Sequence, residues 1–181
     1  MKKIDIQEFN ELIKTANYIK PKLKRDLKFN NSIASLTEEE WNCTEMLPIF
    51  DKSKNHGVLV VDFDDNDKYF VPFDLYAMST NVIGRTKPII CDFCRTWRPG
   101  SESSSISFPK DKQSLNTVTF LCCGDLKCSM NSRNKTDASI KSRTQICEDI
   151  SIDDKILRLK NKITEVINDL GLKAIEQAKL N

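Results

Sequence analysis

Two pairs of cysteines constrain this chain more than any other feature of its sequence. Two residues separate Cys91 from Cys94, and four separate Cys123 from Cys128. A tight turn with the first spacing points two thiolates at one ion. A strand end followed by the first turn of a helix can bring the second pair to the same point. Four thiolates suit a tetrahedral zinc ion in a closed, structural site. The sequence therefore predicts one structural Zn²⁺ held by these four cysteines.

Other roles for these cysteines remain open from the sequence alone. Four cysteines can also hold an iron–sulfur cluster. A redox Cys-x-x-Cys motif opens a helix within a βαβ unit, and no such pattern surrounds Cys91. A cysteine nucleophile needs a basic partner, and the only histidine, His56, precedes a predicted strand. The simplest alternative is burial of cysteines as small apolar side chains.

The identity of the third ligand is open as well, because Cys122 adjoins Cys123. Successive side chains of a strand point to opposite faces, so only one of the two can face the metal. The spacing to Cys128 favours Cys123. Cys43 and Cys147 have no partner at ligand spacing and are interpreted as ordinary small residues.

The rest of the sequence is typical of a cytoplasmic binding protein. The first residues are charged and lack the apolar core of a signal peptide, and the longest aliphatic run, Val58 to Val61, is too short to span a membrane. In a reducing compartment the odd number of seven cysteines does not indicate disulfides. A closed cysteine site leaves no open metal position, and no catalytic dyad is visible. We therefore expect neither an enzyme with a small-molecule substrate nor a membrane partner.

Hydrophobic periodicity predicts helices at both ends of the chain. Apolar residues at helical spacing indicate a helix over residues 4–27, which Pro21 should interrupt. A short helix anchored by Trp41 is expected soon after Thr37. The most regular apolar stripe runs through residues 151–171, with Ser151 as its cap and Gly171 as its end.

An antiparallel hairpin is predicted between these helices. Residues 57–63 and 68–73 are rich in β-branched and aromatic side chains and flank the polar turn 64–67. The turn carries several aspartates, but it lacks the glycine and glutamate of an EF-hand, so we favour a hairpin turn over a calcium site. Residues 131–150 are polar and are predicted to form an exposed loop.

Charge is distributed unevenly along the chain. Between Gly84 and Cys147 there are eleven basic and five acidic residues, an excess of +6, whereas the whole chain carries +2. The cysteine-rich region should therefore present the basic face of the molecule, although charged side chains are also common on any solvated surface.

The motifs around the cysteines resemble those of a known family. Cys91-x-x-Cys94-Arg95, the strand ending in Cys123-Gly-Asp125, and Cys128-Ser-x-x-x-Arg133-x-Lys135 resemble the treble-clef zinc finger of FusB-type elongation factor G-binding proteins. The resemblance is specific over residues 88–170 and looser from Trp41 to Gly84. FusB-type proteins bind elongation factor G and promote its release from the ribosome, which protects translation from fusidic acid. They carry a helical bundle before the zinc domain, and the residues before Trp41 are too few for a four-helix bundle.

The resemblance implies an α+β fold, in which an antiparallel sheet with a treble-clef zinc finger is flanked by N-terminal and C-terminal helices. We predict a helical segment over residues 1–40 and an α+β domain over residues 41–171. The zinc site should lie within residues 88–135, and residues 172–181 should form a tail.

Two functions follow from the resemblance and the charge. The first is binding to elongation factor G or a ribosome-associated protein. The second is binding to RNA, with basic side chains on phosphates and aromatic rings on bases. In either case the candidate contact residues are Arg95, Arg98, Lys127, Arg133 and Lys135. The candidate stacking residues are Phe93, Trp97, Phe108 and Phe120, of which Phe108 and Phe120 are expected to lie in the core.

Overall fold

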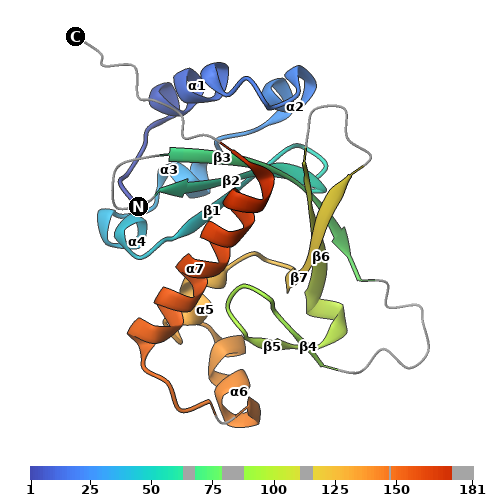
Figure 1. Cartoon of the computed structure of the whole chain (residues 1–181). Coiled ribbons are helices and arrows are strands. Elements are labelled where there is room, and N and C mark those ends of the chain that lie inside the picture. Colours follow the sequence, from blue (N-terminus) through green and yellow to red (C-terminus); the bar gives the residue numbers. More distant parts are fainter. Residues whose placement is uncertain (63–67, 79–87, 111–115, 147, 173–181) are drawn as a thin grey trace. The chain divides into compact units, whose positions relative to one another are not determined.

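The computed structural model describes residues 1–62, 68–78, 88–110, 116–146 and 148–172 (Figure 1). The chain divides into two compact units, each built from separate segments. Unit 1 comprises residues 1–74, 108–117 and 170–181, and unit 2 comprises residues 75–107 and 118–169. A compact unit is not necessarily a segment that folds by itself. The predicted boundaries of the α+β domain, at residues 40/41 and 171/172, therefore stay predictions.

Unit 1 begins with short helices: α1 (Ile6–Thr15), α2 (Pro21–Asp26), α3 (Asn31–Ala34) and α4 (Glu38–Asn42). Pro21 is the first residue of α2, where its missing N–H is not needed, so the predicted break in the first helix is confirmed. A capping box between Thr37 and Glu40 starts α4. Trp41, the predicted anchor of this helix, is 1% exposed.

Three antiparallel strands follow: β1 (Met46–Phe50), β2 (His56–Asp62) and β3 (Lys68–Ala77). The predicted hairpin is confirmed as β2 paired with β3, with Val60 opposite Phe70. The aspartate-rich turn, for which calcium was the alternative, lies outside the described residues. Strand β1 was not predicted, because it is short and contains Pro48. Proline is tolerated there because β1 is the edge strand of its sheet.

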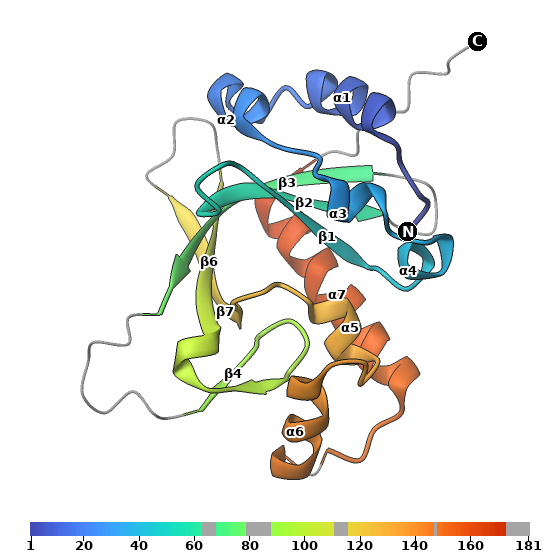
Figure 2. The same ribbon diagram turned by 180° about the vertical axis from the view of Figure 1, so that it is seen from behind.

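The core of unit 1 joins its helices to one side of these strands (Figure 2). Phe9 of α1 packs its ring 5.7 Å from that of Phe70. The hydroxyl oxygen of Tyr18 accepts a hydrogen bond from the backbone N–H of Phe70 at 3.1 Å, and burial raises the pKa of Tyr18 to about 12. Residues before Trp41 thus form much of this core, which also includes Leu47, Ile49, Val58 and Val60.

Unit 2 contains the end of β3 and the short elements around the cysteines. They are β4 (Ile89–Ile90), β5 (Trp97–Arg98), a 3₁₀ turn (Gly100–Glu102), β6 (Ser103–Pro109), β7 (Thr117–Cys123) and α5 (Cys128–Ser132). The last two residues of β6 and the first residue of β7 belong to unit 1. Backbone pairing orders the larger sheet β1-β2-β3-β6-β7, and β4 pairs with β5 separately. Mixed helices and antiparallel strands with helices at both termini confirm the predicted α+β class.

Helix α6 (Asp137–Ile146) corrects the prediction of an exposed loop over residues 131–150. The helix was missed because it buries small polar side chains rather than large apolar ones. Ser139 and Ser142 are 3% and 5% exposed. The hydroxyl of Thr136 accepts a hydrogen bond from the N–H of Ser139 at 3.1 Å, which caps the first turn.

The predicted C-terminal helix is confirmed as α7 (Ile152–Leu170). The hydroxyl of Ser151 accepts a hydrogen bond from the N–H of Asp154 at 3.0 Å, and Gly171 follows the helix with a φ of +60°. The stripe is buried from Leu159 onward, whereas Ile152 is 46% exposed, so the first turn of the helix lies outside the core. Among the helices of the described residues, none has the length and apolar composition of a membrane span.

Candidate metal centre

The first cysteine pair lies in the turn between β4 and β5. Cys91 donates its backbone N–H to the carbonyl of Thr96 at 3.0 Å, and the N–H of Arg95 bonds to the carbonyl of Cys91 at 2.9 Å. Arg95 takes a left-handed conformation with a φ of +59°, which closes the turn. Both cysteine side chains therefore lie on the inside of one tight loop.

The second pair is carried by the end of β7 and the start of α5. Cys123 is the last residue of β7 and Cys128 is the first of α5. The linking loop is held close to β6, because the N–H of Gly124 bonds to the carbonyl of Glu102 at 2.9 Å. A Cβ at Gly124 would meet that same oxygen at 3.0 Å, so a side chain there would push the loop away. These contacts hold the start of the Cys123–Cys128 loop against the chain segment that enters β6.

The turn and the strand are also tied directly to each other. The backbone N–H of Asp92 donates a hydrogen bond to the carbonyl of Leu121 at 2.9 Å. In return, the backbone N–H of Leu121 donates to the carboxylate of Asp92 at 2.7 Å. This reciprocal pair holds the loop that carries the first two cysteines beside the strand that carries the third.

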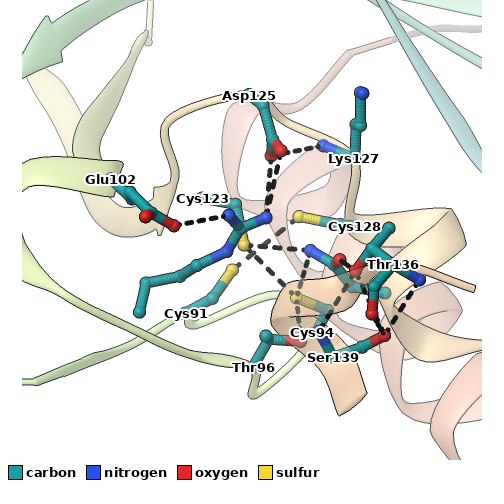
Figure 3. A network of polar contacts seen from close by, with 12 residues as sticks. Cys91, Cys94, Thr96, Glu102, Cys123, Asp125, Lys127, Cys128, Thr136 and Ser139 are labelled. Carbon is teal, nitrogen blue, oxygen red and sulfur yellow. Dashed lines mark hydrogen bonds and ion pairs between the residues drawn. The ribbon is translucent and has the colours of Figure 1, made fainter. Parts of the chain in front are cut away.

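The four sulfur atoms meet in one buried cluster (Figure 3). All four Sγ atoms lie within 4.8 Å of one another. The Cys91–Cys128 and Cys94–Cys123 sulfur pairs are 3.7 Å and 3.6 Å apart. A tetrahedral zinc ion with Zn–S bonds of about 2.3 Å needs sulfur–sulfur distances of about 3.8 Å. The donor set and its spacing therefore fit one structural Zn²⁺.

The charge of the cluster also favours a bound cation. Hydrogen bonds from the other thiols, chiefly from Cys123, lower the pKa of the Cys94 thiol. The pKa of Cys128 is raised, first by its hydrogen bond with Cys123 and then by those with Cys91 and Cys94 and by burial. Without a metal, four buried sulfurs so close together cannot all carry negative charge. A divalent ion removes that conflict.

The cluster contains Cys123 and not Cys122. The thiol of Cys122 points to the other side of β7, where it donates a hydrogen bond to the carbonyl of Ser104 at 3.4 Å. Burial raises the pKa of the Cys122 thiol, which suits a neutral packed side chain. Cys43 is half-buried and is not part of the cluster, and Cys147 lies outside the described residues.

Asn131 is a residue of this centre that the sequence did not reveal. Its amide nitrogen donates to the sulfur of Cys123 at 3.3 Å and lies 3.8 Å from that of Cys94. Its amide oxygen accepts a hydrogen bond from the hydroxyl of Thr136 at 2.5 Å, which fixes the orientation of the amide. Its position three residues after Cys128 in α5 is the signal that could have found it, because such residues share a helix face.

The structure separates the five predicted contact residues. The side chain of Arg98 is 8% exposed and forms ion pairs with Glu102 at 3.1 Å and Asp125 at 3.0 Å. Burial alone would lower the pKa of Arg98, but the charges of Cys123 and Asp125 raise it more. Arg98 is therefore a buried structural cation, which corrects the surface role expected for it.

The other four basic residues are more accessible. Arg95, Lys127 and Lys135 are exposed, whereas Arg133 is half-buried and donates to the carbonyl of Ser129 at 3.1 Å. Lys127 directly precedes the ligand-spaced Cys128, and Arg95 directly follows Cys94. These two positive charges therefore border the cysteine cluster on separate loops.

Comparison with family models decides the classification. The model described as FBP C-terminal treble-clef zinc-finger, the zinc domain of FusB-type proteins, matches residues 23–170. The chain belongs to this family. The match extends well upstream of the motifs that carried the resemblance and includes most of α2, together with α3, α4 and the first strands. A treble-clef zinc finger in this family is a binding domain. Neither the curated proteins nor the solved structures gave a match.

Proposed function

We propose that this protein binds elongation factor G through unit 2, with one zinc ion held by Cys91, Cys94, Cys123 and Cys128. The observation that carries the proposal is the family match over residues 23–170, which includes all four cysteines. When bound, the zinc ion cross-links the β4–β5 turn, the end of β7 and the start of α5. The chemistry of this site is structural, so the protein acts by binding, in the cytoplasm where translation takes place.

The basic residues beside the cluster are the proposed contact surface. Arg95, Lys127 and Lys135 are exposed in unit 2, within the region that carries the excess of +6. Surface charges of this kind speed the encounter with an oppositely charged partner and are screened over about 8 Å at physiological salt. Arg98 is excluded from this surface by its burial.

RNA binding remains the second candidate, and the placement of the aromatic rings weighs against it. Phe93 and Phe108 are 1% and 0% exposed, so neither can stack on a base. Phe120 is half-buried, in edge-to-face contact with Phe93, and the ammonium of Lys162 lies 4.4 Å from the centre of its ring. Of the four candidate stacking residues, Trp97 alone is left half-exposed without such a contact among the described residues. A single ring is a poor platform for single-stranded RNA.

The proposal is tested with purified components. Nuclease-treated elongation factor G should bind the zinc-loaded protein in surface plasmon resonance, which measures association rates. The double variant Lys127→Glu, Lys135→Glu should associate several-fold more slowly and show a weaker salt dependence, while it keeps its zinc. Lys20→Glu, Lys22→Glu, a reversal of two exposed lysines in unit 1, is the matched control and should bind as the wild type does.

The proposal fails if purified factor G does not bind. Binding of structured RNA with a steep salt dependence would then favour the second candidate. Release of the factor from the ribosome and protection from fusidic acid are further steps, which a ribosome-release assay measures separately.

A further inference from the structure

A small polar pocket lies beside the cysteine cluster, on the side of Cys94. It has room for about one water-sized group, with a volume of about 20 Å³. Three cationic side chains line it, and each comes from a different element: Arg95 from the β4–β5 turn, Arg143 from α6 and Lys155 from α7. Its remaining lining is mostly hydroxyl and amide groups, supplied by Thr96, Asn131, Asn134, Ser139 and Ser142.

The described carboxylates balance the positive charge of this pocket only in part. Glu148, the carboxylate among its described lining residues, forms two hydrogen bonds with the guanidinium of Arg158, and the charges of Lys155 and Arg95 also help to lower its pKa. Lys155 is 8% exposed, and its ammonium donates to the neutral amide oxygen of Asn134 at 3.3 Å. Arg143 makes no side-chain hydrogen bond or ion pair within the part of the chain that the structure describes. A buried ammonium with a neutral partner is costly unless an anion accompanies it.

The backbone conformation of Arg95 is also unusual. Its φ of +59° lies in the left-handed region, which glycine adopts without a steric penalty and which raises the conformational free energy of other residues. Arg95 therefore contributes its cation to the pocket from the same turn that carries Cys94.

We propose that this pocket binds the carboxylate of an acidic side chain on the protein partner. The inference rests on the proposed function and deepens it, because it assigns a specific contact to the basic face. Arginine side chains bind a carboxylate through paired hydrogen bonds. The small volume admits one oxygen of an aspartate or glutamate carboxylate, whereas a backbone phosphate is bulkier and carries a sugar on either side.

The competing explanation is that the three cations only offset the charge of the metal centre. Four thiolates around one Zn²⁺ leave a net charge of −2, and Cys94 lines the pocket. In that case removal of a cation weakens zinc retention and leaves partner binding unchanged. The two explanations therefore predict losses in different measurements.

The test compares Arg143→Gln with Lys141→Gln in the full-length, zinc-loaded protein. Both residues are exposed on α6, and both changes remove one positive charge, but only Arg143 lines the pocket. We expect Arg143→Gln to weaken binding to purified elongation factor G about tenfold or more. Lys141→Gln should stay within about twofold of the wild type, because it removes only an exposed charge. Both should contain one zinc ion per chain. Equal losses in the two variants, or loss of zinc from Arg143→Gln alone, would overturn the proposal.

A second experiment tests the pocket without elongation factor G. Sodium acetate is titrated into the ¹⁵N-labelled protein at constant ionic strength, with sodium chloride as reference, and the amide signals of Asn134 and Ser142 are followed. Saturable shifts in the wild type and in Lys141→Gln, but not in Arg143→Gln, are expected. If phosphate shifts these signals and acetate does not, the pocket is a phosphate site and the carboxylate assignment is wrong. If factor G fails to bind the wild type, the proposed function falls, and the acetate titration still decides whether the pocket takes a carboxylate.

Discussion

The adjacent cysteines at the end of β7 give the sharpest test of the metal centre, because one substitution made at two neighbouring positions should have opposite outcomes. Cys123→Ser removes one of four sulfurs that lie within 4.8 Å of one another. Cys122→Ser changes a thiol that points away from the cluster and bonds to the carbonyl of Ser104. The two residues are equally buried, at 0% and 1% exposed, so burial does not distinguish them.

The expected magnitudes differ widely. A structural zinc site contributes on the order of 10–16 kcal/mol of apparent binding free energy, which matches or exceeds the net stability of about 5–15 kcal/mol of a typical domain. Loss of one ligand should therefore release the metal and unfold at least unit 2. A serine at position 122 can keep the hydrogen bond to Ser104, so its cost should stay below about 2 kcal/mol. That cost lowers the melting temperature by roughly 2–8 °C.

The assay measures zinc by elemental analysis after gel filtration and melting by circular dichroism. We expect one zinc ion per chain for the wild type and for Cys122→Ser, and none for Cys123→Ser. Zinc loss from Cys122→Ser with retention in Cys123→Ser would move the third ligand by one residue. Wild-type melting of both variants, without any bound metal, would refute the structural role of zinc altogether.

Three further outcomes follow from other contacts. Asn131→Leu should lose zinc to a competing chelator about 10–100-fold more readily than the wild type, because it no longer donates to the sulfur of Cys123, and an unchanged rate would contradict this role. Trp41→Ala should destabilise the protein by about 3–5 kcal/mol in urea unfolding, whereas Trp41→Phe should cost far less, because the indole nitrogen is buried without a hydrogen-bond partner among the described residues. The bond to Arg158 lowers the pKa of Glu148, so the stability that this carboxylate adds is present above its ordinary pKa of about 4.3 and is lost as the pH falls. The difference in unfolding free energy between the wild type and Glu148→Gln should therefore shrink in acid, and a constant difference would contradict this.

Local patterns in the sequence predicted the parts of the fold that depend on near neighbours. Ligand spacing placed the cysteines, alternation in β7 separated Cys122 from Cys123, and the apolar stripe located α7. Each of these features depends on the spacing of residues a few positions apart along one turn, one strand or one helix. The side-chain geometry that a short segment imposes is therefore enough to predict them.

Features that depend on distant contacts were missed. Arg98 was interpreted as a surface cation because one of its two partners, Asp125, is 27 residues away, and only the folded chain brings them to 3.0 Å. Helix α6 was missed because buried serines replace the apolar stripe by which helices are recognised. Strand β1 was missed because Pro48 disfavours a strand everywhere except at a sheet edge, and the edge position is a property of the whole sheet.

The position of the exposed cations follows from the metal centre. Arg95 is covalently next to Cys94, and Lys127 is next to Cys128, so each charge is held one residue from a proposed zinc ligand. The Cys94 and Cys128 loops belong to different elements, and a bound ion would fix the distance between them. If the partner recognises the spacing of these charges, removal of zinc should abolish binding, although Arg95 and Lys127 are still present in the chain. Replacement of the ion after chelation should restore binding and folded structure together, because both depend on the same cross-link.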